Sequence, residues 1–356
     1  MFIKKLVFSL KSPMNLSYWW NLGSLLGLMI VVQILSGFML TFYYENSPYS
    51  FNSLWMIHLD MVKGYLLHYI HLNMASYVFM IMYLHIIKGL LYNSFSQLKY
   101  LWISGWVLMM IMMMIAFMGY VLPWGQMSLW GATVITNLIS AFPIVGISLV
   151  EWVWGGYFVS NFTMKLFFSL HFLIPFILLI MILMHLFILH LFGSSSPLGG
   201  FNMLMKEEFD LIYIWKDAVN ILILMIMMIL SLFFPYVFGD PENFIKASPM
   251  ISPIHIQPEW YFLHYYAILR SIPNKLGAVI FFIMALMMVL SLGLLSAKFQ
   301  VQSTNSWFLS VNIFVVVNMM LMWLGGCPVE APFLLLSKIF TIMYFINPVM
   351  LFFLVK

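Results

Sequence analysis

Four histidines lie inside long apolar segments and form two equal intervals. His71 and His85 are 14 residues apart, and so are His171 and His185. At about 100° per residue, this interval leaves both side chains within roughly 40° on one helix face and about 21 Å apart along the axis. Each of the two segments therefore presents one imidazole near each surface of a membrane.

The order of the apolar segments predicts which histidines face each other. One complete segment separates the two that carry them, so both run in the same direction, with His71 level with His171 and His85 level with His185. Trans imidazole nitrogens on one metal ion are about 4 Å apart, so histidines of one helix cannot share an ion. Two pairs between helices suit bis-imidazole ligation of two haems, one above the other, which would let electrons cross the bilayer. Polar contacts between helices, or a proton path, are the alternatives.

Glycines repeat the same interval in the two neighbouring apolar segments. Gly23 and Gly37 are 14 residues apart, as are Gly105 and Gly119. The missing side chains would let flat porphyrin rings lie against the backbone at two depths. Close helix packing is the alternative explanation, because small residues are common where membrane helices meet. The match to the histidine interval favours contact with haem.

The composition predicts an all-α, polytopic membrane protein. Of 356 residues, 64% are hydrophobic and 7% are charged, with a mean hydropathy of +1.03. A soluble domain would carry about 25% charged residues. Apolar segments of about 20 residues, enough to cross the hydrocarbon core, recur along the chain. We expect eight spans, at residues 22–43, 65–91, 102–122, 164–192, 215–235, 276–297, 306–325 and 334–354.

We expect the first four spans to form a dihaem four-helix bundle. The predicted division is an N-terminal domain of residues 1–200 and a C-terminal four-helix region of residues 201–356. Cys327 is the single cysteine, so the chain has neither a disulfide framework nor a C-x-x-C-H motif for covalent haem. Any haem is therefore held non-covalently.

The loops predict sidedness and possible sites. With eight crossings both termini share a side, and that side carries nine of the Lys and Arg residues against six on the other. The positive-inside rule then places both termini on the cytoplasm-like side. The connections 123–163 and 236–275 are long and apolar, and such loops fold back onto the protein or line a site.

Two groups of polar residues suit a second substrate. His190, Ser194 and the pair Lys216–Asp217 fall at span ends on the terminal side, and they suit proton-coupled reduction of a carbonyl compound. Helix-end anchoring is their alternative role. On the opposite side Glu259 stands among aromatic residues, where partial burial would raise the pKa of its carboxyl and suit it to accept a proton. A simply solvated loop glutamate is the alternative there.

Three motifs add to the histidine pairs. They are GYVLPWGQMSLWGATVITNL at 119–138, GDPENF at 239–244, and PEWYF with YAILRSIPNKLG behind it at 258–277. With these motifs the chain resembles cytochrome b of the cytochrome bc complex, the ubiquinol–cytochrome c reductase, over nearly its whole length. A catalytic subunit that is active only within a multi-subunit complex is what the resemblance implies.

The resemblance implies roles for individual residues. His71 and His171 match ligands of the low-potential haem b, and His85 and His185 match those of the high-potential haem b. Glu259 matches the residue that takes a proton from ubiquinol. The matching ubiquinol-site residues are Phe117, Tyr120, Gly131, Pro258, Tyr261, Phe262 and Tyr266. The matching residues of the quinone-reduction site are His190, Ser194, Lys216 and Asp217, and Lys88 is expected to bind the second haem in place of an arginine.

The resemblance also implies a setting and a bifurcated mechanism. One ubiquinol electron passes to a Rieske-type iron–sulfur protein, and the other crosses through both haems to reduce quinone on the far side. The expected partners are that protein, a cytochrome c1-type subunit, other complex subunits and lipid in a homodimeric complex, with no nucleic acid. The expected location is the mitochondrial inner membrane, with both termini on the matrix side, in an invertebrate.

The chain departs from the family pattern near the haems. His68, Leu166 and Lys88 stand where the family has arginines, and Met74 stands where a glycine is common. Because guanidinium partners of the haem propionates are missing, we expect a shifted potential for the low-potential haem. A haem-free ion-coupled transporter and a ferric reductase are the rival functions. A reduced-minus-oxidised spectrum separates the first, and the PEWYF motif argues against the second.

Overall fold

Long apolar helices dominate the computed structural model, which describes residues 11–196, 206–295 and 305–353. Eight helices of these ranges are long and apolar enough to cross a membrane, and they agree with the eight predicted spans. The spanning helices are α2 (Leu22–Thr41), α4 (Gly64–Leu91), α6 (Lys99–Val121), α9 (Asn161–Phe192), α10 (Phe209–Phe233), α12 (Lys275–Leu295), α13 (Asn305–Gly325) and α14 (Phe333–Phe353).

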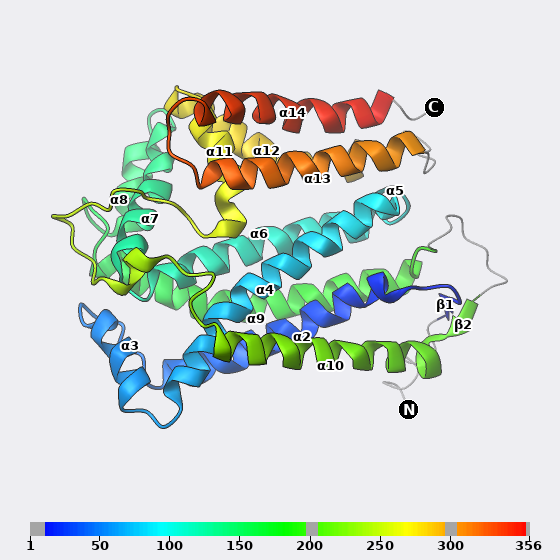
Figure 1. Cartoon of the computed structure of the whole chain (residues 1–356), viewed down its shortest axis with the longest axis horizontal. Helices are drawn as coiled ribbons and strands as arrows, with labels where there is room; N and C mark the ends of the chain where they lie inside the picture. Colours follow the sequence, from blue (N-terminus) through cyan, green and yellow to red (C-terminus); the bar gives the residue numbers. More distant parts are fainter. Residues whose placement is uncertain (1–10, 197–205, 296–304, 354–356) are drawn as a thin grey trace.

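Shorter elements connect or cap the spans. The helical ones are η1 (Tyr18–Asn21), α3 (Ser50–Leu59), α5 (Ser94–Gln97), α7 (Gln126–Asn137), η2 (Leu138–Ala141), α8 (Gly146–Trp154), η3 (Pro241–Phe244), η4 (Trp260–Phe262) and α11 (Leu263–Ser271). Strands β1 (Lys11–Pro13) and β2 (Lys206–Glu208) form a two-stranded antiparallel sheet. The described chain starts and ends at one end of the bundle, and α3, α7 and α8 lie at the other (Figure 1).

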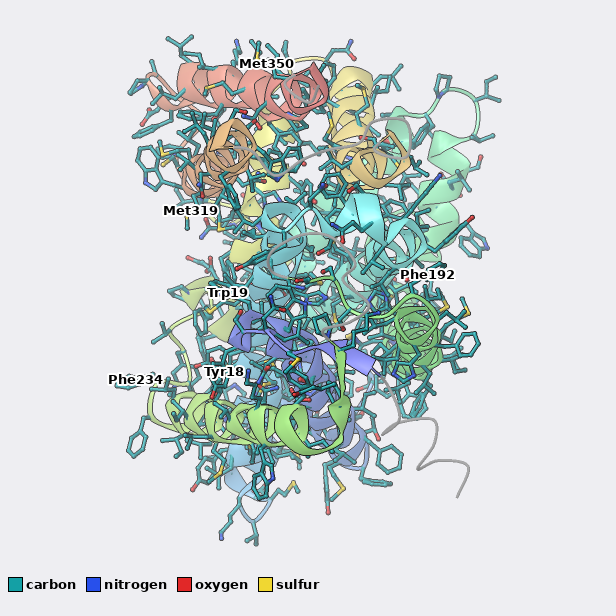
Figure 2. All side chains as sticks on the ribbon, turned by 90° about the vertical axis from the view of Figure 1, so that its right-hand side faces the viewer. Tyr18, Trp19, Phe192, Phe234, Met319 and Met350 are labelled. Atoms are coloured by element: carbon teal, nitrogen blue, oxygen red, sulfur yellow. The ribbon has the colours of Figure 1, made fainter. Side chains whose placement is uncertain are left out.

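The helices form two packed groups. In the first, α2 packs against α4 and α6 packs against α9, and α10 covers α2 and α4. In the second, α11, α13 and α14 pack together, and α12 joins them to α6. Large apolar side chains project outward from the spans, as the exposed Phe192, Phe234 and Met319 illustrate (Figure 2). Because lipid is the solvent that such a surface requires, the chain is a multi-pass membrane protein.

The two long connections fold back onto the protein, as expected from their length, and they also pair with each other. Gly125 forms an isolated antiparallel bridge with Lys246, and the Gln126 amide donates to the Ile245 carbonyl over 2.9 Å. Asn243 accepts from both the amide and the hydroxyl of Ser128, each over 3.0 Å. These bonds hold the segment after α6 and the segment after α10 together at the α3 end of the bundle.

Candidate functional site

Two cavities open between the four helices α2, α4, α6 and α9. Cavity A, at the α3 end, has a volume of about 230 Å³, and cavity B, toward the chain termini, about 500 Å³. Cavity A is lined by His71, His171, Gly37 and Gly119 among others. Cavity B is lined by His85, His185, Gly23 and Gly105 among others. The structure therefore groups the histidines and glycines in the two sets that the interval and the direction of the helices predicted.

A single layer of apolar side chains separates the cavities. Four residues line both of them, one from each helix: Ile30, Val78, Met112 and Leu178. Each stands at the midpoint of its helix's interval of 14 residues, seven from either glycine or histidine. This layer, called the septum below, keeps the two polar sites apart by a thickness of one side chain.

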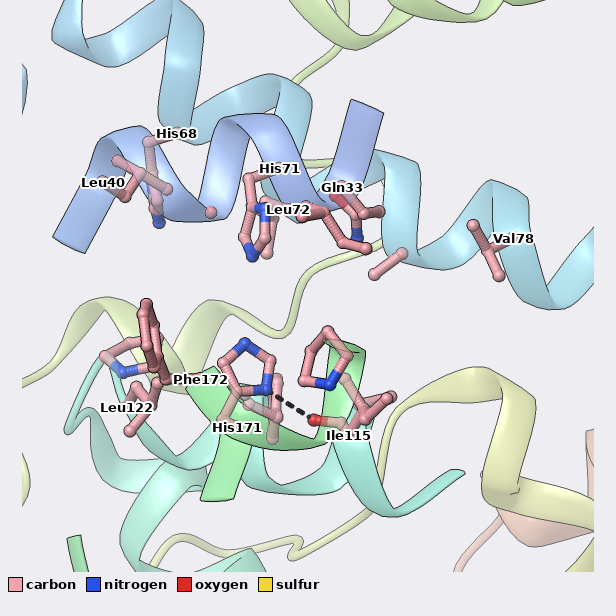
Figure 3. A pocket seen from close by; sticks show the side chains of 18 of the residues that line it. Gln33, Leu40, His68, His71, Leu72, Val78, Ile115, Leu122, His171 and Phe172 are labelled. Atoms are coloured by element: carbon pink, nitrogen blue, oxygen red, sulfur yellow. Dashed lines mark hydrogen bonds between the residues drawn. The ribbon is translucent and has the colours of Figure 1, made fainter. Parts of the chain in front are cut away.

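In cavity A two imidazoles face each other across the space (Figure 3). The ring centroids of His71 and His171 are 6.3 Å apart and the ring planes are 87° apart. His71 Nδ1 lies 3.0 Å from the Ser36 hydroxyl, and His171 Nδ1 donates to the Ile115 carbonyl over 2.8 Å. These bonds leave Nε2 of each ring for a metal, and two metal–nitrogen bonds of about 2 Å fit between rings at this separation.

In cavity B only one of the two imidazoles is held by a hydrogen bond at Nδ1. His185 Nδ1 lies 2.7 Å from the Ser104 hydroxyl. His85 Nδ1 is buried and has no hydrogen-bond partner among the described residues. Lys88, also on the cavity wall, is buried with its Nζ 3.9 Å from the centre of the Trp20 ring. This geometry is a cation–π contact between the Lys88 ammonium and the indole face.

The four glycines make room for the histidine rings themselves. A Cβ added to any of them would lie within 3.5 Å of an imidazole carbon, from Gly23 to His85, Gly37 to His71, Gly105 to His185 and Gly119 to His171. In the described part of the chain, no three His, Cys, Asp or Glu residues lie close enough to hold a metal ion together. Each pair could supply two nitrogen ligands to a metal whose other ligands come from a planar group between the rings. The residues present fit haem.

Cavity A also contains a carboxyl. Glu259 and Tyr261 lie on its wall together with Tyr120. Burial and the nearby Asp240 carboxyl raise the pKa of Glu259 to about 8, against a smaller opposing effect of the Tyr120 hydroxyl. Tyr261 is fixed by stacking on Phe79, with centroids 4.0 Å apart. This carboxyl is therefore poised to change its protonation near neutral pH.

Other predicted ubiquinol-site residues lie outside the lining of either cavity. Phe117 packs against Phe167 with ring centroids 5.7 Å apart, and Phe262 packs edge-on against Phe79. The Tyr266 hydroxyl donates to the Ile256 carbonyl. Gly131 is buried in α7, and Pro258 precedes Glu259 in the loop. Their role in binding a substrate stays a prediction.

Cavity B brings together most of the second polar group. His190, Ser194 and Asp217 line it, and Ser24 donates to the Asp217 carboxylate over 2.7 Å. Lys216 does not join them, because its Nζ donates to the Leu16 carbonyl over 2.7 Å and lies near the Tyr18 and Tyr213 rings. The structure thus places three of the four residues on the wall of cavity B, and their role at a substrate stays a prediction.

The departures from the family pattern have distinct surroundings. His68 lines cavity A, and its Nδ1 lies 2.7 Å from His58 Nε2. Leu166 joins an apolar cluster beside α7. Met74 is fully buried between α2, α4 and α10, so the side chain that replaces a glycine fills core space.

The residues that hold the imidazoles lie outside the predicted set. Ser36 and Ser104 each precede a predicted glycine, and each contacts the same histidine as that glycine does. The Ser-Gly dipeptide, found at two of the four glycines, is the signal that identifies them. No sequence signal identifies the Ile115 carbonyl.

Comparison with known proteins covers nearly the whole chain. A family model described as cytochrome b/b6/petB matches residues 7–193, and one described as cytochrome b (C-terminal)/b6/petD matches residues 246–345. A solved structure titled "Hyperthermophilic respiratory Complex III" contains a chain that superposes with a TM-score of 0.90 at 30% identity. The alignment covers 99% of this chain and 96% of that one.

Proposed function

The chain belongs to the cytochrome b family and is a core electron-transfer subunit of a bc-type complex, and from this premise we propose that it oxidises ubiquinol at cavity A and reduces quinone at cavity B. Membership in this family removes the transporter and the ferric reductase as rivals. It also implies haem b as the cofactor. One observation carries the proposal: each of the two cavities is lined by a histidine pair and by a carboxyl.

The proposed haem ligands are His71 with His171 and His85 with His185. When bound, haem supplies a one-electron carrier at each level. The chain fixes three of the four imidazoles through Nδ1, which sets the ring orientation and the tautomer. The septum places four apolar side chains between the two levels.

At cavity A, Glu259 is the proposed proton acceptor for ubiquinol. With a pKa of about 8, the Glu259 carboxylate can take a proton from ubiquinol and can release that proton again afterwards. Tyr261 closes the wall beside it, held by Phe79 and by the bond from the Tyr83 hydroxyl to its carbonyl. Most of the remaining lining surface is apolar, which suits a quinone ring and its isoprenoid tail.

At cavity B, His190 and Asp217 are the proposed proton donors to reduced quinone, with Ser194 as a hydrogen-bond partner. Ser24 keeps the Asp217 carboxylate on the cavity wall. Asn220 donates to Ser24 over 2.8 Å and thereby supports this arrangement. Quinone carbonyls accept hydrogen bonds from such groups, and the cavity is about 500 Å³ in volume.

The wider setting is part of the same proposal. Residues 1–200 form the dihaem domain and 201–356 the region with the PEWY loop. The chain works with a Rieske-type iron–sulfur protein and a cytochrome c1-type subunit in a dimeric complex. It lies in the mitochondrial inner membrane, with both termini on the matrix side and cavity A toward the intermembrane space. The excess of Lys and Arg on the terminal side supports this orientation.

Absorbance spectra of variants that lack one proposed haem ligand test the proposal. The assembled complex should show two b-type components in a reduced-minus-oxidised spectrum. Replacing His71 or His171 with Leu should remove one component, and replacing His85 or His185 should remove the other. His255, which lies on neither cavity wall, provides the control substitution His255→Gln. A single component, or loss of the same component from both pairs, contradicts the ligand assignment.

A further inference from the structure

Two histidines outside the proposed ligand pairs form a direct hydrogen bond. His58 on α3 and His68 on α4 approach with Nε2 and Nδ1 2.7 Å apart and ring centroids 4.8 Å apart. A neutral imidazole has one N–H donor and one acceptor nitrogen, so one ring donates and the other accepts. The second nitrogen of each ring remains available for another partner.

The two rings face different surroundings. His68 lies on the wall of cavity A, which it shares with Glu259, and Figure 3 shows its ring directed from α4 toward the cavity. His58 is half-buried on α3, and the next two residues, Leu59 and Asp60, are exposed. The pair therefore connects the interior of cavity A with the outer end of the molecule.

The side chains that contact the pair are aromatic and carry no charge. Tyr69 packs edge-on against His58 with centroids 5.3 Å apart, and its hydroxyl lies 2.6 Å from that of Tyr236. Trp55 lies at 6.2 Å on the other side. Within the described ranges no carboxylate forms a hydrogen bond with either imidazole, and the nearby charged residues Asp60 and Lys63 are exposed. Burial lowers the pKa of His58, so this ring is neutral near pH 7.

We propose that His58 and His68 form a proton relay that leads out of cavity A. His68 accepts a proton at Nε2 from the cavity side while its Nδ1–H passes a proton to His58 Nε2. His58 then releases the proton on its Nδ1 to water beside α3. One proton enters and one leaves, no electron moves, and rotation of the rings restores the starting tautomers. The inference rests on the proposed function, because ubiquinol oxidation at Glu259 supplies the proton.

The test uses the assembled complex in liposomes with a pH dye on the α3 side. His58→Gln keeps an amide that can bond to His68 but cannot relay a proton, and His255→Gln is the matched control. We expect His58→Gln to slow proton release and ubiquinol oxidation together by roughly tenfold and to increase the solvent deuterium isotope effect. Both b-type absorbance components should remain, and His255→Gln should behave as the unmodified complex.

Chemical rescue separates a relay from a packing contact. In His58→Ala, added imidazole should restore most of the rate, whereas it should not change the rate of His255→Ala. The relay is wrong if His58→Gln releases protons at the unmodified rate, or if imidazole fails to rescue His58→Ala. Failure of the unmodified complex to reduce haem b with ubiquinol would overturn the proposed function instead.

Discussion

Gly119 lies directly against the imidazole of His171, because a Cβ added to Gly119 would be 2.5 Å from the ring carbon Cε1. Gly37 faces His71 in the same way at 2.8 Å. In cavity B the corresponding distances are longer, 3.3 Å from Gly105 to His185 and 3.5 Å from Gly23 to His85. The glycine pattern therefore positions the proposed ligands, and it does so more tightly in cavity A.

Alanine substitutions at these glycines should have graded effects. Gly119→Ala and Gly37→Ala force an imidazole to move, since real Cβ contacts below 3.0 Å are essentially absent, and should cost about 1–3 kcal/mol. We expect loss or displacement of the b-type component of cavity A. Gly23→Ala makes an ordinary contact and should retain both components. The α-band spectrum and haem content measure this, and equal loss in Gly119→Ala and Gly23→Ala would contradict it.

The two levels of histidines were predictable because helix periodicity is local. Counting residues from His71 to His85, and spans between the two helices, was enough to group the four rings. The contacts that orient the rings were not predictable, because Ser36, Ser104 and Ile115 come from other helices. A spacing within one segment contains no information on such long-range partners.

The lack of information on long-range contacts also explains why only part of the second polar group lines cavity B. Lys216 and Asp217 are neighbours in sequence, but successive residues on a helix point about 100° apart, so only one of them faces cavity B. The hydrogen bond between His58 and His68 could not be predicted either, because it depends on how α3 folds back against α4. Single residues at helix ends are therefore assigned to a site less securely than a repeated interval inside spans.

Removing a serine that holds an imidazole should shift the potential of one haem only. A hydrogen bond from Nδ1–H makes the ring a stronger electron donor to iron, so its loss should raise the potential by a few tens of millivolts. Ser36→Ala should act on the component of cavity A, and Ser104→Ala on that of cavity B. Each variant is the control for the other in a redox titration. A shift of both components by one substitution would contradict the pairing.

Ubiquinol oxidation should depend on the ionisation of Glu259. Only the carboxylate accepts a proton, so with a pKa of about 8 the rate should rise with pH and level off above about 8. Asp240→Asn removes the neighbouring negative charge and should move this rise to lower pH, whereas Glu259→Gln should remove it. In the folded chain the pKa of Glu259 lies above the ordinary value of 4.5, so the unfolded chain loses this proton at a lower pH than the folded chain does. The free energy of unfolding should therefore fall as the pH rises from 4.5 to about 8. An unchanged pH–rate profile in Asp240→Asn would contradict the assignment.

Asp217 and Lys216 should differ sharply in their effect on quinone reduction. Asp217→Asn removes a proton donor from the wall of cavity B and should reduce the reoxidation rate of the cavity B haem by about 100-fold. Lys216→Met breaks the bond to the Leu16 carbonyl but removes no side chain from the lining of cavity B, so it should leave the KM for quinone near its original value. Reoxidation kinetics with added quinone measure both. A large increase of KM in Lys216→Met would place the lysine at the substrate after all.

Truncating the septum should destabilise the bundle without removing a ligand. Leu178 is 2% exposed and lines both cavities, so Leu178→Ala leaves a void between them and should cost about 2–5 kcal/mol. Leu183 lies on the same helix with 66% of its surface exposed, and Leu183→Ala should change stability by less than about 0.5 kcal/mol. Thermal unfolding of the assembled complex, followed by haem absorbance, compares them. Because the imidazoles are untouched, both b-type components should remain in Leu178→Ala at low temperature. Equal melting temperatures for the two variants would show that the layer does not stabilise the bundle.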